Sequence, residues 1–360
     1  MTHRKSLVFF ADKLFPAVGG VESHGRYFIE YFGQHPSYTL HIITKTHAGD
    51  DVLVKKDKKT KPLNRLAMCQ LPADLIFYNS GAWIEQLNLH KKLWPQAKYL
   101  YRTGGNEILQ AALVDHFVDA HRTRQRYWTD QLNATIDALI VNSSFTKKRL
   151  QTLGITCKLM KVVGGATTHQ RLARQLMPHT PVFVSAARFV PYKNHRLLID
   201  IFHALHQQGF QYRLKLYGEG VLLGTMQQLV HKYALQNHIE FLGAVDNQLV
   251  CSAIAQADCY IQLSQDMPTK VPGGSYVHTE GMGRSILEAI AAHTFVMAGK
   301  AGALDEIVTT QNGVLLDTTN PPKIIQTIRE MCYPPPPVHN TTDYSWHGVF
   351  TQYESIFAQL

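Results

Sequence analysis

Two cations stand five residues apart in "SAARFVPYKNHRLLIDIF", where Arg188 and Lys193 follow a run typical of a buried strand. We expect both in the loop at the carboxyl end of that strand, which is the edge where open α/β sheets bind ligands. Arg offers a planar fork of donors and Lys a point charge, so two fixed cations at this edge suit a diphosphate. A solvated loop explains the same residues, because Lys and Arg are mostly exposed in any protein.

Two carboxylates stand eight residues apart in "HTEGMGRSILEAIAAHTFVMAG", Glu280 before a Gly-x-Gly and Glu288 inside a predicted helix that begins at about Ser285. The amides of residues 282–285 would form a helix start, whose positive end binds anions. For Glu288 there is a structural alternative. Ser285-x-x-Glu288 fits a capping box, in which the carboxylate satisfies the N–H of the cap, and these residues alone favour it.

Paired glycines, Gly19 and Gly20, open another predicted helix in "FPAVGGVESH". Glycine lets backbone amides approach a phosphate closely, although a turn from strand to helix favours glycine in any case. In "LYGEG", Gly218 begins a further turn into a helix, but Gly224 comes one residue too late for a dinucleotide fingerprint. Hydride transfer is therefore disfavoured.

Metal and disulfide chemistry find little support in the sequence, which has no Asp-x-Asp, no His-x-x-x-His and, among five cysteines, no Cys-x-x-Cys. A metal-held diphosphate, a zinc knuckle and a disulfide framework are disfavoured accordingly. The apolar run after the N-terminus is too short for a signal peptide, and no run approaches the ~20 residues of a spanning helix. We expect a cytoplasmic protein whose contact with a membrane, if any, is peripheral.

Positive charge is concentrated in the first 170 residues, which carry 23 Lys and Arg against 13 Asp and Glu, whereas the remainder carries 13 against 14. The densest stretch is "VKKDKKTK" at 54–61. Such a positive field would attract an anionic membrane surface or an acidic acceptor. The alternative is that these residues form an ordinary solvated surface with no ligand. Nucleic acid is disfavoured because no helix-turn-helix, zinc-finger or aromatic RNA-binding signature occurs.

The order of elements predicts an α/β protein with two doubly wound parallel sheets, because short β-type runs alternate with helical patterns in two successive series. At 360 residues the chain suits two domains with a cleft between them. The break is expected near 168–181, where the strand pattern lapses. A proline-rich stretch at 333–340 reads as an extended connector, and the helix after it is expected to return to the first domain.

These pieces, in this order, resemble the retaining glycosyltransferases of family 4, which have the GT-B fold. The matching stretches are "PAVGGVESH", "AARFVPYKNHRLLIDIF", "LKLYGEG", "IEFLGAV", "EGMGRSILEAIAAHTFVMAGKAGALDEIV" and "YSW". The resemblance implies a Rossmann-like acceptor domain at 1–172, completed by a helix at 344–360, and a Rossmann-like donor domain at 173–335. It implies a hexosyltransferase that makes polysaccharide, lipopolysaccharide or glycolipid.

The resemblance also implies roles for the residues above. Arg188 and Lys193 would neutralise the diphosphate in place of a metal, so that no metal or other cofactor is needed, and Glu280 would hold the transferred sugar. Glu288 would accept the ribose hydroxyls. The remaining donor-binding positions implied are Gly19, Gly20, Gly218, Gly243, Gly281, Met282, Gly283 and Arg284.

Two departures from the family leave other functions open. Many members carry a His midway through the first domain, where this chain has "YRTGGNEILQ", and Asn106 or Glu107 would have to stand in. The stretch 264–278 is longer than usual and is expected to form a lid or an acceptor loop.

The donor would be a nucleotide-diphosphate sugar and the acceptor a glycan or a lipid-linked molecule. The alternatives are an inactive GT-B partner of another transferase and a GT-B epimerase acting on the nucleotide sugar.

Overall fold

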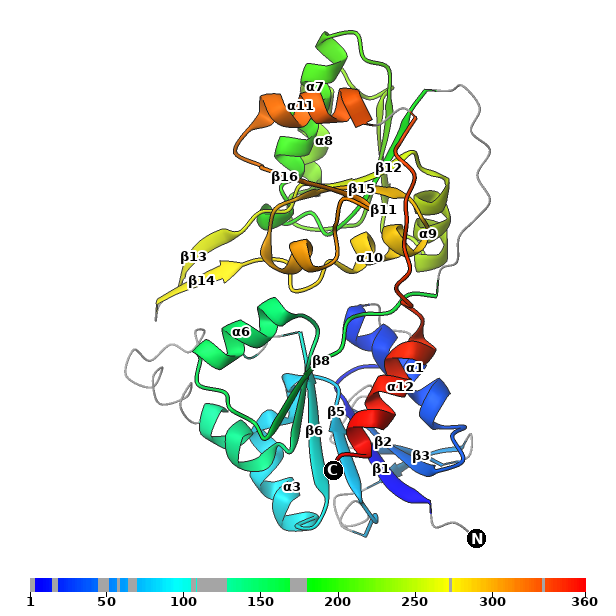
Figure 1. Ribbon diagram of the computed structural model, residues 1–360, viewed down its shortest axis with the longest axis vertical. Helices are drawn as coiled ribbons and strands as arrows, with labels where there is room; N and C mark the ends of the chain where they lie inside the picture. Colours follow the sequence, from blue (N-terminus) through cyan, green and yellow to red (C-terminus); the bar gives the residue numbers. More distant parts are fainter. Residues whose placement is uncertain are drawn as a thin grey trace. The chain divides into compact units, whose positions relative to one another are not determined.

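The computed structural model describes most of the chain in two compact units (Figure 1). The described residues are 4–14, 19–44, 52–56, 59–63, 70–104, 108, 128–168, 180–271, 274–331 and 334–360. Unit 1 comprises Met1–Gly164, Lys270–Tyr276 and Trp346–Leu360, and unit 2 comprises Gly165–Thr269 and Val277–Ser345. The predicted boundary at 172/173 falls outside the described residues.

Unit 1 is built on a six-stranded parallel sheet with the order β2-β1-β5-β6-β7-β8. Its strands are β1 (Lys5–Ala11), β2 (Tyr38–Thr44), β5 (Leu75–Tyr78), β6 (Lys98–Thr103), β7 (Ala138–Val141) and β8 (Leu159–Val162). Its helices include α1 (Gly20–Phe32), α3 (Leu87–Leu93), α6 (Ser144–Thr152) and α12 (Trp346–Phe357). Strands β5 and β7 are buried along their whole length, as expected for a parallel sheet covered on both faces.

The last helix, α12, packs against α1 within unit 1, which confirms the predicted return of the C-terminal helix (Figure 1). Aromatic rings make the contact: Tyr27 stacks on Trp346 with the centroids 4.7 Å apart, and Phe28 meets Phe350 edge to face. The buried His24 ring lies at hydrogen-bond distance, 2.9 Å, from the hydroxyl of Tyr353. A helix far along the chain thus completes the core of unit 1.

The most basic stretch of unit 1 lies in a hairpin that the sequence did not predict. Strands β3 (Val52–Lys56) and β4 (Lys59–Leu63) pair antiparallel, with Lys56 opposite Lys59 and Lys55 opposite Thr60. Apolar and polar residues do not alternate regularly in this lysine-rich run, so the sequence gives no clear indication of a strand. The backbone register thus places lysine positions of the two strands opposite or next to one another.

Unit 2 repeats the plan with a parallel sheet ordered β11-β10-β9-β12-β15-β16. Its strands are β9 (Val182–Ala186), β10 (Arg213–Tyr217), β11 (Ile239–Gly243), β12 (Cys259–Gln262), β15 (Phe295–Gly299) and β16 (Gly313–Leu316). Its α-helices are α7 (His195–Gln207), α8 (Leu223–Lys232), α9 (Asn247–Gln256), α10 (Arg284–Ala291) and α11 (Pro321–Met331). The strand order reverses between β9 and β12, and ligands of doubly wound sheets bind at such a switch point.

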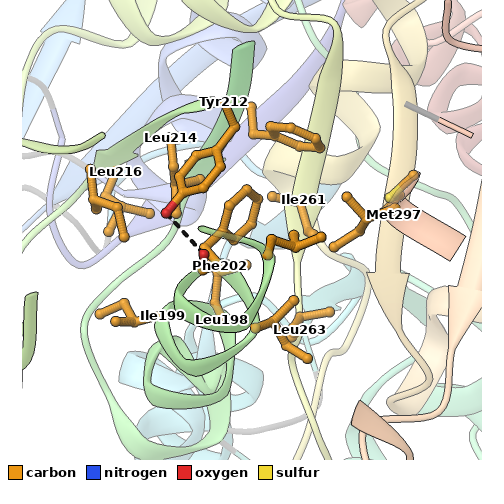
Figure 2. Packing of buried hydrophobic residues seen from close by; sticks show 14 of the residues in the cluster. Leu198, Ile199, Phe202, Tyr212, Leu214, Leu216, Ile261, Leu263 and Met297 are labelled. Carbon is orange, nitrogen blue, oxygen red and sulfur yellow. Dashed lines mark hydrogen bonds between the residues drawn. The ribbon is translucent and has the colours of Figure 1, made fainter. Parts of the chain in front are cut away.

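Helices cover both faces of the sheet in unit 2, with α7, α8 and α11 on one side and α9 and α10 on the other (Figure 1). Figure 2 shows the first of these cores, where Phe202 packs against Ile261 and Leu263, and where the hydroxyl of Tyr212 donates to the carbonyl of Phe202 at 2.9 Å. Successive residues of β12 alternate between the faces, so Ile261 enters this core while Tyr260 enters the other. The two cores hold the carboxyl ends of β9 and β12 in fixed positions.

The long stretch before Glu280 forms a two-stranded sheet of β13 (Met267–Val271) and β14 (Gly274–His278). The sequence predicted a lid or an acceptor loop here, and the strands were missed because neither "MPTKV" nor "GSYVH" is a continuous apolar run. At the base of this sheet the side chains of Asp266 and Thr279 are hydrogen-bonded to each other. Asp266 also accepts from the amide of Gly302 at 3.0 Å.

Candidate active site

The loop that carries Arg188 is tied to the turn after β10. The amide of Ala187 donates to Tyr217, and that of Phe189 to Glu219, at 3.0 and 2.8 Å. Gly218 allows this close approach, because its φ is +123° and a Cβ there would lie 2.2 Å from the carbonyl oxygen of Ala187. Gly218 therefore shapes the loop beneath Arg188. Gly243, at the end of β11, accepts the Gly218 amide at 2.8 Å.

Arg188 itself is exposed, and its guanidinium lies 3.4 Å from the hydroxyl of Tyr192. The Tyr192 ring stacks on that of His278, at the end of β14, with the centroids 5.8 Å apart. The Lys193 ammonium lies 5.3 Å from the centre of the same Tyr192 ring. Tyr192 thus contacts both cations of the loop.

Lys193 and Glu280, 87 residues apart in sequence, form an ion pair at the switch point. The Lys193 Nζ and Glu280 Oε1 atoms are 2.5 Å apart, and the two side chains are only 12% and 7% exposed. Lys193 ends a short 3₁₀ turn, after which Asn194 adopts a left-handed conformation and α7 begins. The next residue, His195, is buried against the Phe189 ring, and burial together with the Lys193 charge lowers its pKa to about 4.

Further hydrogen bonds fix the Glu280 carboxylate. Its Oε1 atom accepts from Gln262 Nε2 at 2.9 Å and from Ser264 Oγ at 2.6 Å, where Gln262 ends β12 and Ser264 follows two positions later. The Glu280 carbonyl accepts the amide of Ala303 at 2.9 Å. A buried carboxylate that accepts from a cation and two neutral donors is held in one orientation.

The helix α10 begins at Arg284, and the capping-box interpretation of Glu288 is wrong. Gly283 is the N-cap, with a φ of +75°, and no side chain caps the helix. Ser285 lies inside the first turn, where its Oγ is 2.7 Å from the hydroxyl of Tyr260. The local pattern Ser-x-x-Glu was present, but the left-handed Gly283 starts the helix earlier than the pattern required.

Glu288 is instead a buried partner in a polar cluster, and only 3% of it is exposed. Its Oε1 lies 3.2 Å from Arg284 Nε and 3.3 Å from Asn247 Nδ2 at the start of α9. Burial and the Glu288 charge raise the pKa of the nearby Cys251 thiol. The arrangement holds the Glu288 carboxylate in the first turns of α10, between Arg284 and Asn247.

In unit 2 the structure brings Lys193 and Glu280 into contact, and Tyr192 contacts both Arg188 and Lys193. Met282, in the turn before α10, has its sulfur 2.8 Å from the amide of Gly165. Gly19 and Gly20 belong to unit 1, where Gly19 is the N-cap of α1 in an extended conformation. Asn106 and Glu107 lie outside the described residues.

Sequence reasoning missed three residues of the cluster: Gln262, Ser264 and Asn247. The first two lie at the end of "CYIQLS", which was interpreted only as a buried strand. A signal was present, because polar side chains in a strand buried on both faces need partners. Asn247 gave no comparable signal.

Residues 170–344 match the family model of glycosyl transferases group 1. Among curated relatives, a GDP-mannose-dependent alpha-(1-6)-phosphatidylinositol monomannoside mannosyltransferase of Mycobacterium tuberculosis is 26% identical over 159 residues, 44% of this chain and 40% of the relative. A related mannosyltransferase of Corynebacterium glutamicum, specific by its name for the monoacylated substrate, is 28% identical over 152 residues, 42% of this chain and 38% of the relative. The chain thus matches about two fifths of the length of these relatives.

Solved structures similar to this chain cover nearly all of it. Anabaena HepE, in complex with UDP and glucose, superposes with a TM-score of 0.71 at 17% identity and covers 99% of this chain and 100% of HepE. Sucrose-phosphate synthase of Thermosynechococcus elongatus gives a TM-score of 0.70 at 15% identity, covering 99% of each chain. The chain has a GT-B fold. This fold contains the two parallel sheets that the sequence predicted, each of which has six strands.

In the ranges that the structure describes, no helix is both long and apolar enough to cross a bilayer. Within the same ranges, no three His, Cys, Asp or Glu side chains gather closely enough to hold a metal ion.

Proposed function

We propose that the protein is a retaining glycosyltransferase that moves a sugar from a nucleotide-diphosphate sugar to a glycan or a lipid-linked acceptor. The observation that carries this proposal is the Lys193–Glu280 pair at the switch point of unit 2, beside Arg188 and the start of α10. The match of residues 170–344 to glycosyl transferases group 1 supports it.

In this proposal, the cationic residues of the site stabilise the negative charge that develops during the reaction. Cleavage of the anomeric bond places negative charge on the departing diphosphate, and Arg188, Lys193 and the amides at the start of α10 stabilise that charge. Glu280 holds the sugar, and Glu288 accepts hydrogen bonds from the ribose. The acceptor attacks on the face that the diphosphate leaves, and the diphosphate takes the proton, so the anomeric configuration is kept.

The first experiment is a thermal-shift screen of UDP, GDP, UDP-glucose and GDP-mannose, which represent the donors and ligands named for the relatives and solved neighbours. A ligand at 100 times its dissociation constant stabilises the folded state by about 2.7 kcal/mol. The anomeric configuration of the product, determined by NMR, then tests retention, and inversion would contradict it. Binding with no transfer to any acceptor would favour the inactive partner, and interconversion of the nucleotide sugar without an acceptor would favour the epimerase.

Activity is expected to survive an excess of EDTA, because Lys193 and Arg188 supply the positive charge that a metal supplies in other transferases. The measurement compares initial rates with the chelator, without it, and with added Mn²⁺. Equal rates under the three conditions support the proposal. Loss of activity in EDTA with recovery in Mn²⁺ would show that a metal, and not these two side chains, carries the leaving-group charge.

We propose that unit 1 also binds an anionic surface, consistent with an acceptor at the inner face of a membrane. The excess of basic residues in the first 170 positions and the lysine-rich strands β3 and β4 support this. Vesicles with acidic lipid are expected to retain the protein at low salt and release it as salt rises, because the charges are screened. Equal retention by neutral vesicles would rule out an electrostatic origin.

A further inference from the structure

The strand β12 places two polar side chains in the core beneath the start of α10. Tyr260 and Gln262 are 0% and 1% exposed and lie on the same face of the strand, two residues apart. The hydroxyl of Tyr260 lies 2.8 Å from Gln262 Oε1 and 2.7 Å from the hydroxyl of Ser285. Burial of polar groups costs free energy unless they are hydrogen-bonded, and these two side chains are hydrogen-bonded to each other, to Ser285 and to the backbone of Ala186.

The amide of Gln262 joins this buried pair to the candidate active site. Its Nε2 atom donates to Ser264 Oγ and to Glu280 Oε1, each at 2.9 Å. Its Oε1 atom faces the two hydroxyl donors, Tyr260 and Ser285, the latter at 3.3 Å. A carboxylate can only accept and an amide nitrogen can only donate, so the hydroxyls on one side and the carboxylate on the other allow a single orientation of the amide.

All these contacts act on one oxygen of Glu280. Among the residues that the structure describes, Lys193, Gln262 and Ser264 contact the carboxylate, and each does so at Oε1. The other oxygen, Oε2, takes no part in those three contacts. The network thus determines which carboxylate oxygen is held by the protein and which is left to accept from a ligand.

We propose that Tyr260 and Gln262 are positioning residues that present Oε2 of Glu280 to a hydroxyl of the transferred sugar. This inference rests on the proposed function, and it assigns recognition of the sugar, as distinct from the nucleotide, to a network that reaches from Glu280 to Ser285 in α10. Tyr260 acts on Glu280 through Gln262, whose Oε1 lies 2.8 Å from the Tyr260 hydroxyl, and the same hydroxyl also contacts Ser285 in α10.

The test separates sugar recognition from nucleotide recognition by measuring dissociation constants calorimetrically for UDP, GDP, UDP-glucose and GDP-mannose. In Tyr260→Phe the Gln262 carbonyl loses a donor, so the affinity for the wild type's preferred nucleotide sugar is expected to fall about fivefold, a cost of about 1 kcal/mol. The affinity for the matching nucleoside diphosphate, which has no sugar, is expected to stay within about twofold of wild type.

Tyr212→Phe is the matched control. It removes a buried hydroxyl of the same unit, which donates to the carbonyl of Phe202 at 2.9 Å in the other core (Figure 2). It should lower the melting temperature about as much as Tyr260→Phe does, with both affinities unchanged. A second variant, Gln262→Met, keeps the length of the side chain and removes its hydrogen bonds, so it should reproduce the loss of sugar affinity even if Tyr260→Phe does not fold.

The remaining outcomes overturn the inference. Equal loss of both affinities in Tyr260→Phe and Gln262→Met would give the network a purely structural role. Unchanged affinity for the nucleotide sugar in a folded variant would show that Glu280 needs no such positioning. If the wild type binds none of the four compounds, the proposed function fails together with this inference, whereas a wild type that binds normally confines the failure to the inference.

Discussion

Replacing Lys193 by Ala is expected to lower the turnover rate by about 100-fold or more, the usual cost of losing one preorganised charge-stabilising donor. Lys193 is the less exposed of the two cations of the loop, and its Nζ lies 2.5 Å from the Glu280 carboxylate. Its loss removes positive charge from the departing diphosphate and leaves Glu280 without its counter-charge. Arg188→Ala is expected to have an effect of the same order, although Arg188 is exposed and its removal leaves no buried charge unpaired.

Stability measurements separate the catalytic loss from a folding defect. Lys232→Ala, an exposed lysine at the end of α8, is the matched control and should leave the turnover rate and the melting temperature unchanged. In Lys193→Ala the melting temperature is expected to fall because Glu280 is left uncompensated, and Lys193→Ala combined with Glu280→Gln should regain stability without regaining turnover. Turnover close to wild type in either Lys193→Ala or Arg188→Ala would remove the proposed diphosphate site.

Replacing Glu288 by Gln is expected to raise the Michaelis constant for the donor about tenfold or more, since one hydrogen bond to a charged group contributes about 1.5–3 kcal/mol. The carboxylate can accept from both ribose hydroxyls, whereas Gln offers one oxygen and turns a donor toward the second hydroxyl. The wild type should discriminate against a 2′-deoxy nucleotide, and Glu288→Gln much less. The structure sharpens this test because Glu288 does not cap α10.

The competing explanation is that Glu288 serves only as the ion-pair partner of Arg284, whose Nε is 3.2 Å away. In that case Glu288→Gln would lower the melting temperature and leave the Michaelis constant unchanged. Glu330→Gln, on the exposed face of α11, is the matched control and should alter neither quantity. Discrimination against the 2′-deoxy nucleotide that persists unchanged in Glu288→Gln would assign the ribose contact to another residue.

Much of the fold could be predicted from the sequence because the strands of a sheet covered on both faces are short continuous apolar runs, such as "LIFY" in β5 and "ALIV" in β7. The hairpins β3–β4 and β13–β14 lack that signal and were missed. The start of α10 was predicted to within one residue, but the capping box is absent because the left-handed Gly283, whose conformation no local pattern reveals, is the N-cap.

The candidate site was predictable only in its parts. Arg188, Lys193, Glu280 and Glu288 stand out by type and position, but their distances depend on the strand order. The contact of Lys193 with Glu280 arises because β9 and β12 are neighbours in the sheet. The amide of Gln262 could not be placed in advance, since its partners come from three separate parts of the chain.

The position of α12 has a consequence for the order in which the protein folds during synthesis. Unit 1 contains both Met1–Gly164 and Trp346–Leu360, so the ribosome produces nearly all of unit 2 before it supplies the helix that packs on α1. Until then Phe28, which is fully buried in the finished fold, lacks the aromatic cover of Phe350 and Tyr353. Unit 2 can therefore fold first. Unit 1, most of which is synthesised earliest, completes its core last.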